Sequence, residues 1–228
     1  MPAGNGFHTA AFSENGEGVI LYSLLLKTGY RPFMRTVFRM EIAGAERIPA
    51  EGPCILAANH ESIVDPYVVG VVTARPIHFM AKGELWRNPL SRAVMEGFGA
   101  FPVERGTGDG AAVGRAGQLL ERGDVLGIFP QGTCVPRRDR PYLSGAARLA
   151  LATGSPLVPV CTVGTEQLIR PHRTRIGFPQ LRVLVARPLI VAMQRPTLVA
   201  ARELTRRVED AIAELRRPYG EPKHAWID

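Results

Sequence analysis

The stretch CILAANHESIVDP, residues 54–66, decides how this chain folds. Its first part, Cys54–Ala58, is a short apolar run of the kind that forms a strand buried on both faces of a sheet. Asn59 and His60 follow directly, and a segment with helical spacing begins at Ser62. We therefore expect a strand followed by a helix, with polar side chains at a junction where α/β proteins commonly hold reacting groups.

The same alternation continues on both sides of this stretch. Short apolar runs alternate with longer helix-spaced segments, which is typical of an α/β domain. The expected strands are 54–58, 77–81, 100–103, 125–129, 157–162 and 182–186, with another near 38–43. The expected helices are 62–73, 84–98, 110–122, 144–153 and 197–217. We predict an α/β fold in a single domain, with a mostly parallel or mixed central sheet flanked by helices.

A basic amphipathic segment is expected to precede this domain. Residues 18–40 combine an apolar stretch with Lys27, Arg31, Arg35 and Arg39. The first part is predicted to be a helix that lies either on a membrane surface or against the core. We expect a flexible N-terminus over 1–17, an amphipathic helical segment over 18–35, the main domain over 36–217 and a tail over 218–228.

The composition excludes several classes of protein. With 228 residues, of which 46% are hydrophobic, the chain can bury a sizeable core and is not disordered. No run approaches the roughly 18–20 apolar residues of a membrane-spanning helix. No histidine has the spacing of a metal ligand, so we assign no metal. The three cysteines lack any Cys-x-x-Cys pair and are interpreted as reduced, mostly buried thiols: Cys54, Cys134 and Cys161.

The net charge of +7 arises from one segment. Between Cys134 and Arg187 nine arginines stand against two acidic residues, and the rest of the chain is balanced. Such an arginine strip favours a phosphate, an anionic membrane surface or nucleic acid as a partner. Because the strip has few aromatic residues to stack bases and contains no recognition module, a nucleic-acid partner is disfavoured.

His60 and Asp65 have the spacing of a proton-transfer pair. Asp65 lies five positions beyond His60, about one helical turn away, so its carboxylate can hold Nδ1 of the imidazole. Nε2 is then free to accept a proton from a hydroxyl, as in a Ser-His-Asp triad whose nucleophile is supplied by the substrate. The spacing alone is common by chance. Its position between a strand and a helix favours a functional role for the pair.

Three more segments follow in order. They are AKGEL at 81–85, GAFPVER at 99–105 and IFPQGTC at 128–134, with a weaker Val-Pro-Val at 158–160. Together with the first stretch, they resemble the glycerophospholipid acyltransferase family, best known for the lysophosphatidic acid (1-acyl-glycerol-3-phosphate) acyltransferases. The likeness covers about residues 38–163.

The resemblance implies transfer of a fatty acyl group from acyl-CoA or acyl-carrier protein to the hydroxyl of a lysophospholipid, without a cofactor. It implies that His60 is the general base and that Asp65 orients it. It also implies a substrate-binding set, with the acceptor's phosphate on Arg105 and Lys82: Asn59, Lys82, Arg105, Gln131, Gly132 and Thr133. Residues 36–217 would then be the acyltransferase domain of a cytoplasmic protein, peripheral on the inner face of the membrane.

The third segment departs from the family's Phe-Pro-Glu-Gly-Thr-Arg. Gln131 replaces the Glu and loses a negative charge, and Cys134 replaces the Arg and loses a cation with five donors. One hypothesis is that an arginine just beyond replaces this charge: Arg137, Arg138 or Arg140. The alternatives are an O- or N-acyltransferase acting on an amino-lipid, a glycolipid or a secondary metabolite, or a non-catalytic lipid-binding relative. Backbone N–H groups after His60 are candidates to stabilise the oxyanion.

Overall fold

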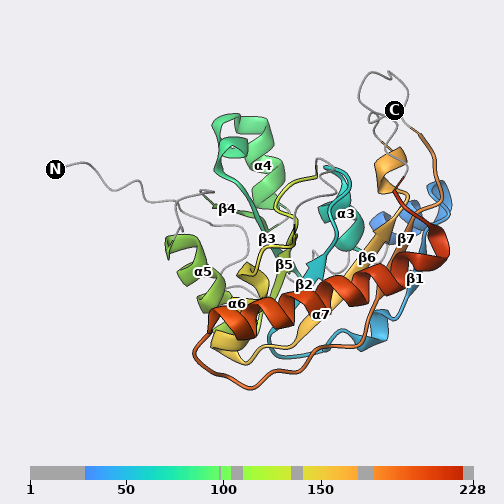
Figure 1. Ribbon diagram of the computed structural model, residues 1–228. Helices are drawn as coiled ribbons and strands as arrows, with labels where there is room; N and C mark the ends of the chain where they lie inside the picture. Colours follow the sequence, from blue (N-terminus) through green and yellow to red (C-terminus); the bar gives the residue numbers. More distant parts are fainter. Residues whose placement is uncertain (1–28, 98, 104–109, 135–140, 169–176, 223–228) are drawn as a thin grey trace.

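The computed structural model describes residues 29–97, 99–103, 110–134, 141–168 and 177–222. Within them, seven strands form one sheet in the order β1-β7-β6-β2-β5-β3-β4 (Figure 1). These are β1 Glu41–Ala43, β2 Cys54–Ala58, β3 Ile77–Lys82, β4 Phe101–Val103, β5 Val125–Ile128, β6 Leu157–Val163 and β7 Arg182–Val185. From β6 to β4 the neighbouring strands are parallel, whereas β7 is antiparallel to β6 and β1 is parallel to β7. The sheet is mixed, which confirms the predicted α/β fold class.

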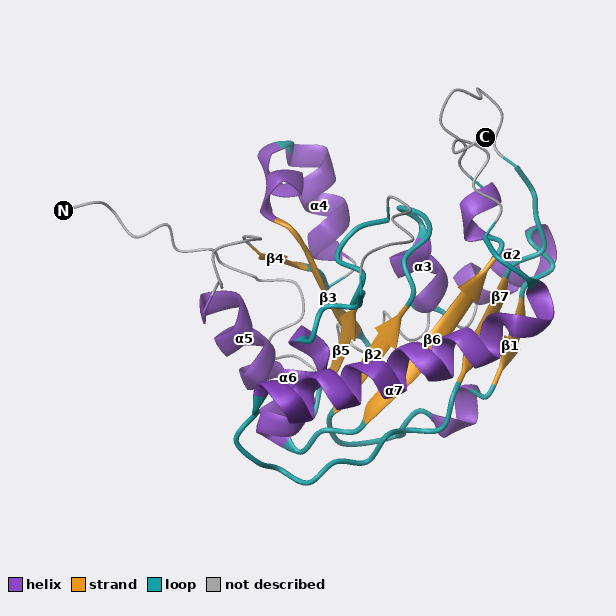
Figure 2. Ribbon diagram, viewed as in Figure 1, coloured by secondary structure: helices purple, strands orange, loops and turns teal. Residues whose placement is uncertain are grey.

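Helices cover both faces of this sheet (Figure 2). The α-helices are α2 Arg31–Val37, α3 Asp65–Val69, α4 Pro89–Gly97, α5 Gly110–Glu121, α6 Gly145–Thr153 and α7 Leu198–Arg216. The 3-10 helices are η2 Ala45–Arg47, η3 Gly83–Arg87, η4 Thr165–Gln167 and η5 Arg217–Tyr219. One core cluster joins the sheet to α5, α6 and α7, and the other joins its opposite face to α2 and α3. The result is a three-layer α/β/α arrangement.

The central strand β2 contributes to both cores. Cys54, Leu56 and Ala58 belong to the cluster under α3, and Ile55 and Ala57 belong to the cluster under α7. Every one of the five is at most 1% exposed. Because successive side chains of a strand point to opposite faces, a strand covered on both sides must be apolar throughout. This explains why the sequence predicted the bounds of β2 correctly.

Helix α3 is much shorter than the predicted 62–73. Asp65 accepts hydrogen bonds from the backbone N–H groups of Glu61 and Ser62, which holds residues 61–64 in a turn rather than a helix. Pro66 occupies the first turn, and Gly70 caps the other end. The helical spacing of the apolar residues was therefore misleading, because a side chain and a proline set the start of the helix.

The predicted helix 84–98 is divided in two. Asn88 adopts an extended conformation with ψ 125° between η3 and α4. A residue that precedes a proline is pushed out of the helical region, and Pro89 follows Asn88. The Asn88 side chain then caps the new helix by accepting from the N–H groups of Leu90 and Ser91. The remaining predicted helices agree with α5, α6 and α7 to within a few residues.

The predicted amphipathic segment 18–35 lies mostly outside the described residues, which begin at 29. Its described end is α2, where Met34 is buried against the core while Phe33 is 51% exposed. The boundaries 1–17, 18–35, 36–217 and 218–228 stay predictions. None of the helices in the described ranges combines the length and the apolar composition needed to cross a membrane.

Gly127 of β5 has no room for a side chain. A Cβ atom at this position would overlap Cε1 and Cδ1 of Phe79, a buried ring on the neighbouring strand β3. We expect Gly127→Ala to lower the free energy of unfolding by about 1–3 kcal/mol through overpacking, measured by urea denaturation. Gly114→Ala is the matched control, because nothing lies within 4 Å of the added atom in α5. The control should gain about 0.5–1 kcal/mol. Equal effects would contradict the packing described.

The thiols differ in accessibility. Burial raises the pKa of the Cys54 thiol to about 11 and that of Cys161 to about 12, whereas Cys134 is partly exposed. Since the thiolate is the reactive form, a disulfide reagent at pH 8 should label one thiol in the folded protein and three after denaturation. Cys134→Ser should abolish the labelling of the folded form. Fast reaction of a second native thiol would contradict this picture.

Candidate functional site

The first and third motifs meet at one edge of the sheet. β2 and β5 are parallel neighbours, so their carboxyl ends lie side by side. Asn59 and His60 follow the end of β2, and Phe129, Pro130 and Gln131 follow the end of β5. The carboxyl edge of a parallel sheet is the usual location of sites in α/β proteins.

His60 and Asp65 are in direct contact. Nδ1 of His60 lies 2.9 Å from Oδ2 of Asp65, and the Asp65 side chain is fully buried. The same Oδ2 accepts from the N–H groups of Glu61 at 2.7 Å and Ser62 at 2.8 Å. The predicted contact between imidazole and carboxylate is therefore present, although a tight turn forms it instead of one turn of helix. Since a carboxylate only accepts, Nδ1 carries its hydrogen and Nε2 has a free lone pair.

Residues after β5 hold His60 from the other side. The ring of Phe129 stacks on the imidazole with centroids 4.2 Å apart, and the ring of Phe79 stacks on Phe129 at 5.7 Å. Oε1 of Gln131 accepts a hydrogen bond from the backbone N–H of His60. The His60 side chain remains 14% exposed. The imidazole is thus fixed in position while one side of it is accessible.

Two of the backbone N–H groups after His60, which were expected to stabilise an oxyanion, are already engaged, as is the N–H of His60 itself. His60 N–H donates to Gln131, and the N–H groups of Glu61 and Ser62 donate to Asp65. The expectation of an oxyanion site among the N–H groups after His60 is therefore wrong for Glu61 and Ser62.

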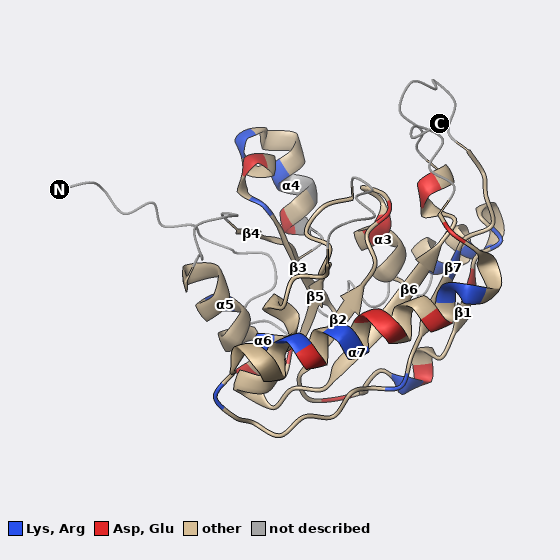
Figure 3. Cartoon of the chain, viewed as in Figure 1, with Lys and Arg blue, Asp and Glu red and all other residues tan. Residues whose placement is uncertain are grey.

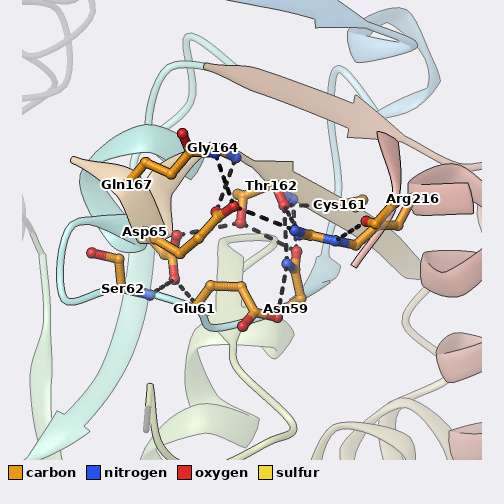
Figure 4. Close-up of polar contacts among 11 residues, drawn as sticks. Asn59, Glu61, Ser62, Asp65, Cys161, Thr162, Gly164, Gln167 and Arg216 are labelled. Atoms are coloured by element: carbon orange, nitrogen blue, oxygen red, sulfur yellow. Dashed lines mark hydrogen bonds and ion pairs between the residues drawn. The ribbon is translucent and has the colours of Figure 1, made fainter. Parts of the chain in front are cut away.

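Asn59 bonds to the neighbouring strand β6. Its Oδ1 accepts from the backbone N–H of Thr162 at 2.6 Å, and its Nδ2 donates to the carbonyl of the same residue at 3.0 Å. The Thr162 hydroxyl lies 3.2 Å from Oδ1 of Asn59 and 3.3 Å from Oδ1 of Asp65. Figure 4 shows these side chains pointing toward one another. Nδ2 of Asn59 also donates to Oε1 of Glu61 at 3.5 Å. With Asn59 only 2% exposed, its amide has no capacity left for a substrate, contrary to the predicted binding role.

The other predicted substrate residues lie around this centre or outside the described chain. Lys82 is exposed at the end of β3, on the far side of β5 from β2, and Arg105 lies outside the described residues. Gly132 has a φ of +71°, and Leu143 packs where its side chain would stand. Thr133 is partly exposed. The structure therefore brings Gln131 to His60 and leaves Lys82 on a separate strand.

The arginine strip is described only in part. Three of its nine arginines belong to the described residues, and Arg182 of these pairs with Glu41 at 2.7 Å. Arg137, Arg138 and Arg140 lie outside the described residues.

Along α7, beyond the arginine strip, the basic side chains alternate with acidic ones (Figure 3). Within the described ranges, no group of three or more His, Cys, Asp or Glu side chains could hold a metal ion.

Two residues of this centre were not found from the sequence. Thr162 contacts Asp65 across 97 positions, and Arg216 contacts Thr162 across 54. Neither has a local pattern that marks it, because a threonine in a strand and an arginine near a helix end are both common. Phe129 belongs to a quoted motif, but its stacking on His60 depends on the pairing of β5 with β2.

Comparison with known proteins places these features in a family. A 1-acyl-sn-glycerol-3-phosphate acyltransferase of Bacillus subtilis is 32% identical over 126 residues, which are 55% of this chain and 63% of that protein. A lyso-ornithine lipid O-acyltransferase of Pseudomonas aeruginosa is 35% identical over 82 residues, which are 36% of this chain and 31% of that protein. In both cases the match spans less than two thirds of the relative's length.

A solved structure has the same fold. The 1-acyl-sn-glycerophosphate (LPA) acyltransferase PlsC of Thermotoga maritima superposes with a TM-score of 0.69 at 20% identity, covering 92% of this chain and 87% of that one. The sequence model of the family described as Acyltransferase matches residues 39–163, which hold the His60–Asp65 pair, the Gln131 segment and all of β6. Because this match covers more than half of the 228 residues, the chain belongs to the acyltransferase family.

Proposed function

We propose that this chain transfers a fatty acyl group from a thioester to the hydroxyl of a lysophospholipid such as 1-acyl-sn-glycerol-3-phosphate, with His60 as the general base. The observation that carries the proposal is the buried Asp65 carboxylate on Nδ1 of a partly exposed imidazole. This arrangement leaves Nε2 as the acceptor of a proton. Relatives named as 1-acyl-sn-glycerol-3-phosphate acyltransferases support the reaction class.

In the proposed step the acceptor's hydroxyl oxygen attacks the thioester carbonyl carbon while its proton passes to Nε2 of His60. The resulting tetrahedral oxyanion collapses with cleavage of the carbon–sulfur bond. The imidazolium then returns the proton to the departing thiolate, so the enzyme ends in its starting state. Asp65 keeps the ring oriented and stabilises the imidazolium as it forms. A lipid hydroxyl needs this help because it is a poor nucleophile at neutral pH.

The acceptor is proposed to place its phosphate near the carboxyl ends of β3 and β4. Lys82 lies there, and Arg105 follows β4 by two positions. A fixed cation orients a phosphate by charge-assisted hydrogen bonds. Cys134, in the segment that follows β5, stands where the family has an arginine, so that segment has one cation fewer. A second candidate acceptor is therefore a lyso-ornithine lipid. A relative that is 35% identical over 82 residues is named as an acyltransferase of this lipid.

The donor and the setting are part of the same proposal. The donor is acyl-CoA or acyl-carrier protein, both of which present the acyl group as a thioester. The site is proposed to work at the inner face of a cytoplasmic membrane, with the protein bound peripherally. The basic segment 18–35 would supply the contact with an anionic surface.

The first test is release of free thiol from palmitoyl-CoA with 1-acyl-sn-glycerol-3-phosphate or a lyso-ornithine lipid as acceptor. We expect acceptor-dependent release that His60→Ala abolishes. Asp65→Asn should lower kcat by roughly 10³–10⁴-fold, because an amide holds the wrong imidazole tautomer. His78→Ala is the control, since the His78 side chain on β3 bonds to the backbone carbonyl of Gly99 and not to this centre. Release that survives His60→Ala would reject His60 as the general base. No release with any acceptor, or with an acyl-carrier donor, would leave a lipid-binding relative as the better explanation.

The role of Gln131 is separable from acceptor binding. Its Oε1 accepts from the N–H of His60, so we expect Gln131→Leu to lower kcat by about 5–100-fold by leaving that N–H without a partner. Gln131→Glu keeps an acceptor oxygen and should retain kcat within a few-fold. The measurement is kcat and KM for both substrates. If Gln131→Leu instead raised only KM for the acceptor, the residue would be a substrate contact, as first predicted.

A further inference from the structure

The C-terminal helix α7 adds a side chain to the network behind His60 and Asp65. Arg216, its last residue, donates from Nη1 to the backbone carbonyl of Thr162 at 3.0 Å (Figure 4). The Arg216 side chain is only 11% exposed. This residue lies well beyond residue 163, where the match to the family model ends. Helix α7 is therefore a part of the site's support that the family motifs do not include.

Thr162 connects Arg216 to Asp65. The Thr162 N–H is held by Asn59, and its carbonyl is held by both Asn59 and Arg216. Because peptide units are planar, fixing the groups on both sides of a Cα atom fixes the direction of its side chain. The Thr162 hydroxyl is thereby held between Oδ1 of Asn59 at 3.2 Å and Oδ1 of Asp65 at 3.3 Å, and the other oxygen of Asp65 contacts His60. Three successive contacts thus lead from the guanidinium to the imidazole.

Glu166 explains why the arginine keeps this position. Its carboxylate lies 3.6 Å from Nη2 of Arg216 and is 2% exposed. The other oxygen of Glu166 accepts from the N–H of Gly164, in the turn directly after β6. A buried guanidinium requires such a partner, because an unpaired charge in the interior is strongly unfavourable. The ion pair therefore fixes the end of α7 to the turn that follows Thr162.

We propose that Arg216 is a positioning residue for acyl transfer, which acts through the Thr162 hydroxyl to hold Asp65 and the Nδ1–H tautomer of His60. This inference rests on the proposed function for its kinetic test. Its structural part, the orientation of the imidazole, can be measured without turnover. Arg216 is largely buried and lies behind Thr162 rather than against the imidazole, so its loss should change kcat and leave KM unchanged.

The experiment compares Arg216→Met with Arg206→Met in the full-length protein. Arg206 is on the same helix with a side chain 61% exposed, and it forms ion pairs with Glu203 and Asp210 outside the network. We expect Arg216→Met to lower kcat on the order of 10- to 100-fold with unchanged KM, as misplacement of a reacting group does. Arg216→Lys, which keeps a donor and the charge, should recover part of the loss. Arg206→Met should match the wild type.

A double-mutant cycle tests the route. Thr162→Val removes the hydroxyl and keeps the shape, while Thr162→Ser retains the donor. If Arg216 acts through this hydroxyl, the double variant Arg216→Met/Thr162→Val should have about the same kcat as the single variant with the lower kcat. Losses that multiply would show independent effects and would overturn the proposed route. The Thr162 variants also decide the question should Arg216→Met fail to fold, because wild-type kcat in Thr162→Val would overturn the proposal.

Imidazole ¹⁵N chemical shifts supply the measurement that needs no turnover. They report which ring nitrogen of His60 carries the proton. We expect the wild type and Arg206→Met to hold Nδ1–H, and Arg216→Met to populate the other tautomer. A shifted tautomer in a protein without acyltransferase activity would support the positioning role and reject the proposed function. An unshifted tautomer together with unchanged kcat would reject the positioning role alone.

Discussion

One buried carboxylate oxygen organises the centre of this molecule. Oδ2 of Asp65 receives hydrogen bonds from the backbone of Glu61 and Ser62 and from the imidazole of His60. The first two contacts close the turn between β2 and α3, and the third uses that turn to orient the ring. A fully buried carboxylate must have such partners to be tolerated. The local fold and the arrangement of the proposed site therefore depend on the same atom.

The parallel sheet supplies the rest of the frame. Strand β5 brings Phe129 and Gln131 to one side of His60, and strand β6 brings Thr162 to the far side of Asp65. The Asn59 amide bonds to both backbone groups of Thr162, as another residue of the strand would. Each strand thus delivers its contribution at its carboxyl end. The geometry is rigid because it is built from the ends of buried strands rather than from long loops.

Gln131 stands where the family has a glutamate, and the structure shows what this replacement changes. The hydrogen bond to the His60 N–H needs only an acceptor oxygen, and glutamine and glutamate both provide one at the same reach. Loss of the negative charge therefore leaves this contact in place. Cys134 is different, because no thiol reproduces the donors of a guanidinium. The two changes in one segment have separate consequences, one for the support of His60 and one for the charge presented to an acceptor.

The sequence by itself determined the strands, most of the helices and the pairing of His60 with Asp65. Buried strands are apolar on both faces, and the pair is separated by only five residues, so both leave local patterns. The helix predicted at 62–73 was too long, because the spacing of hydrophobic residues does not reveal the turn that Asp65 closes. Only the tertiary structure decided that Asn59 faces Thr162 and that Arg216 of α7 reaches the same carbonyl. These contacts join residues that are between 54 and 103 positions apart in the sequence. Residues so far apart are brought together by the order of the strands in the sheet and by the packing of α7 against it.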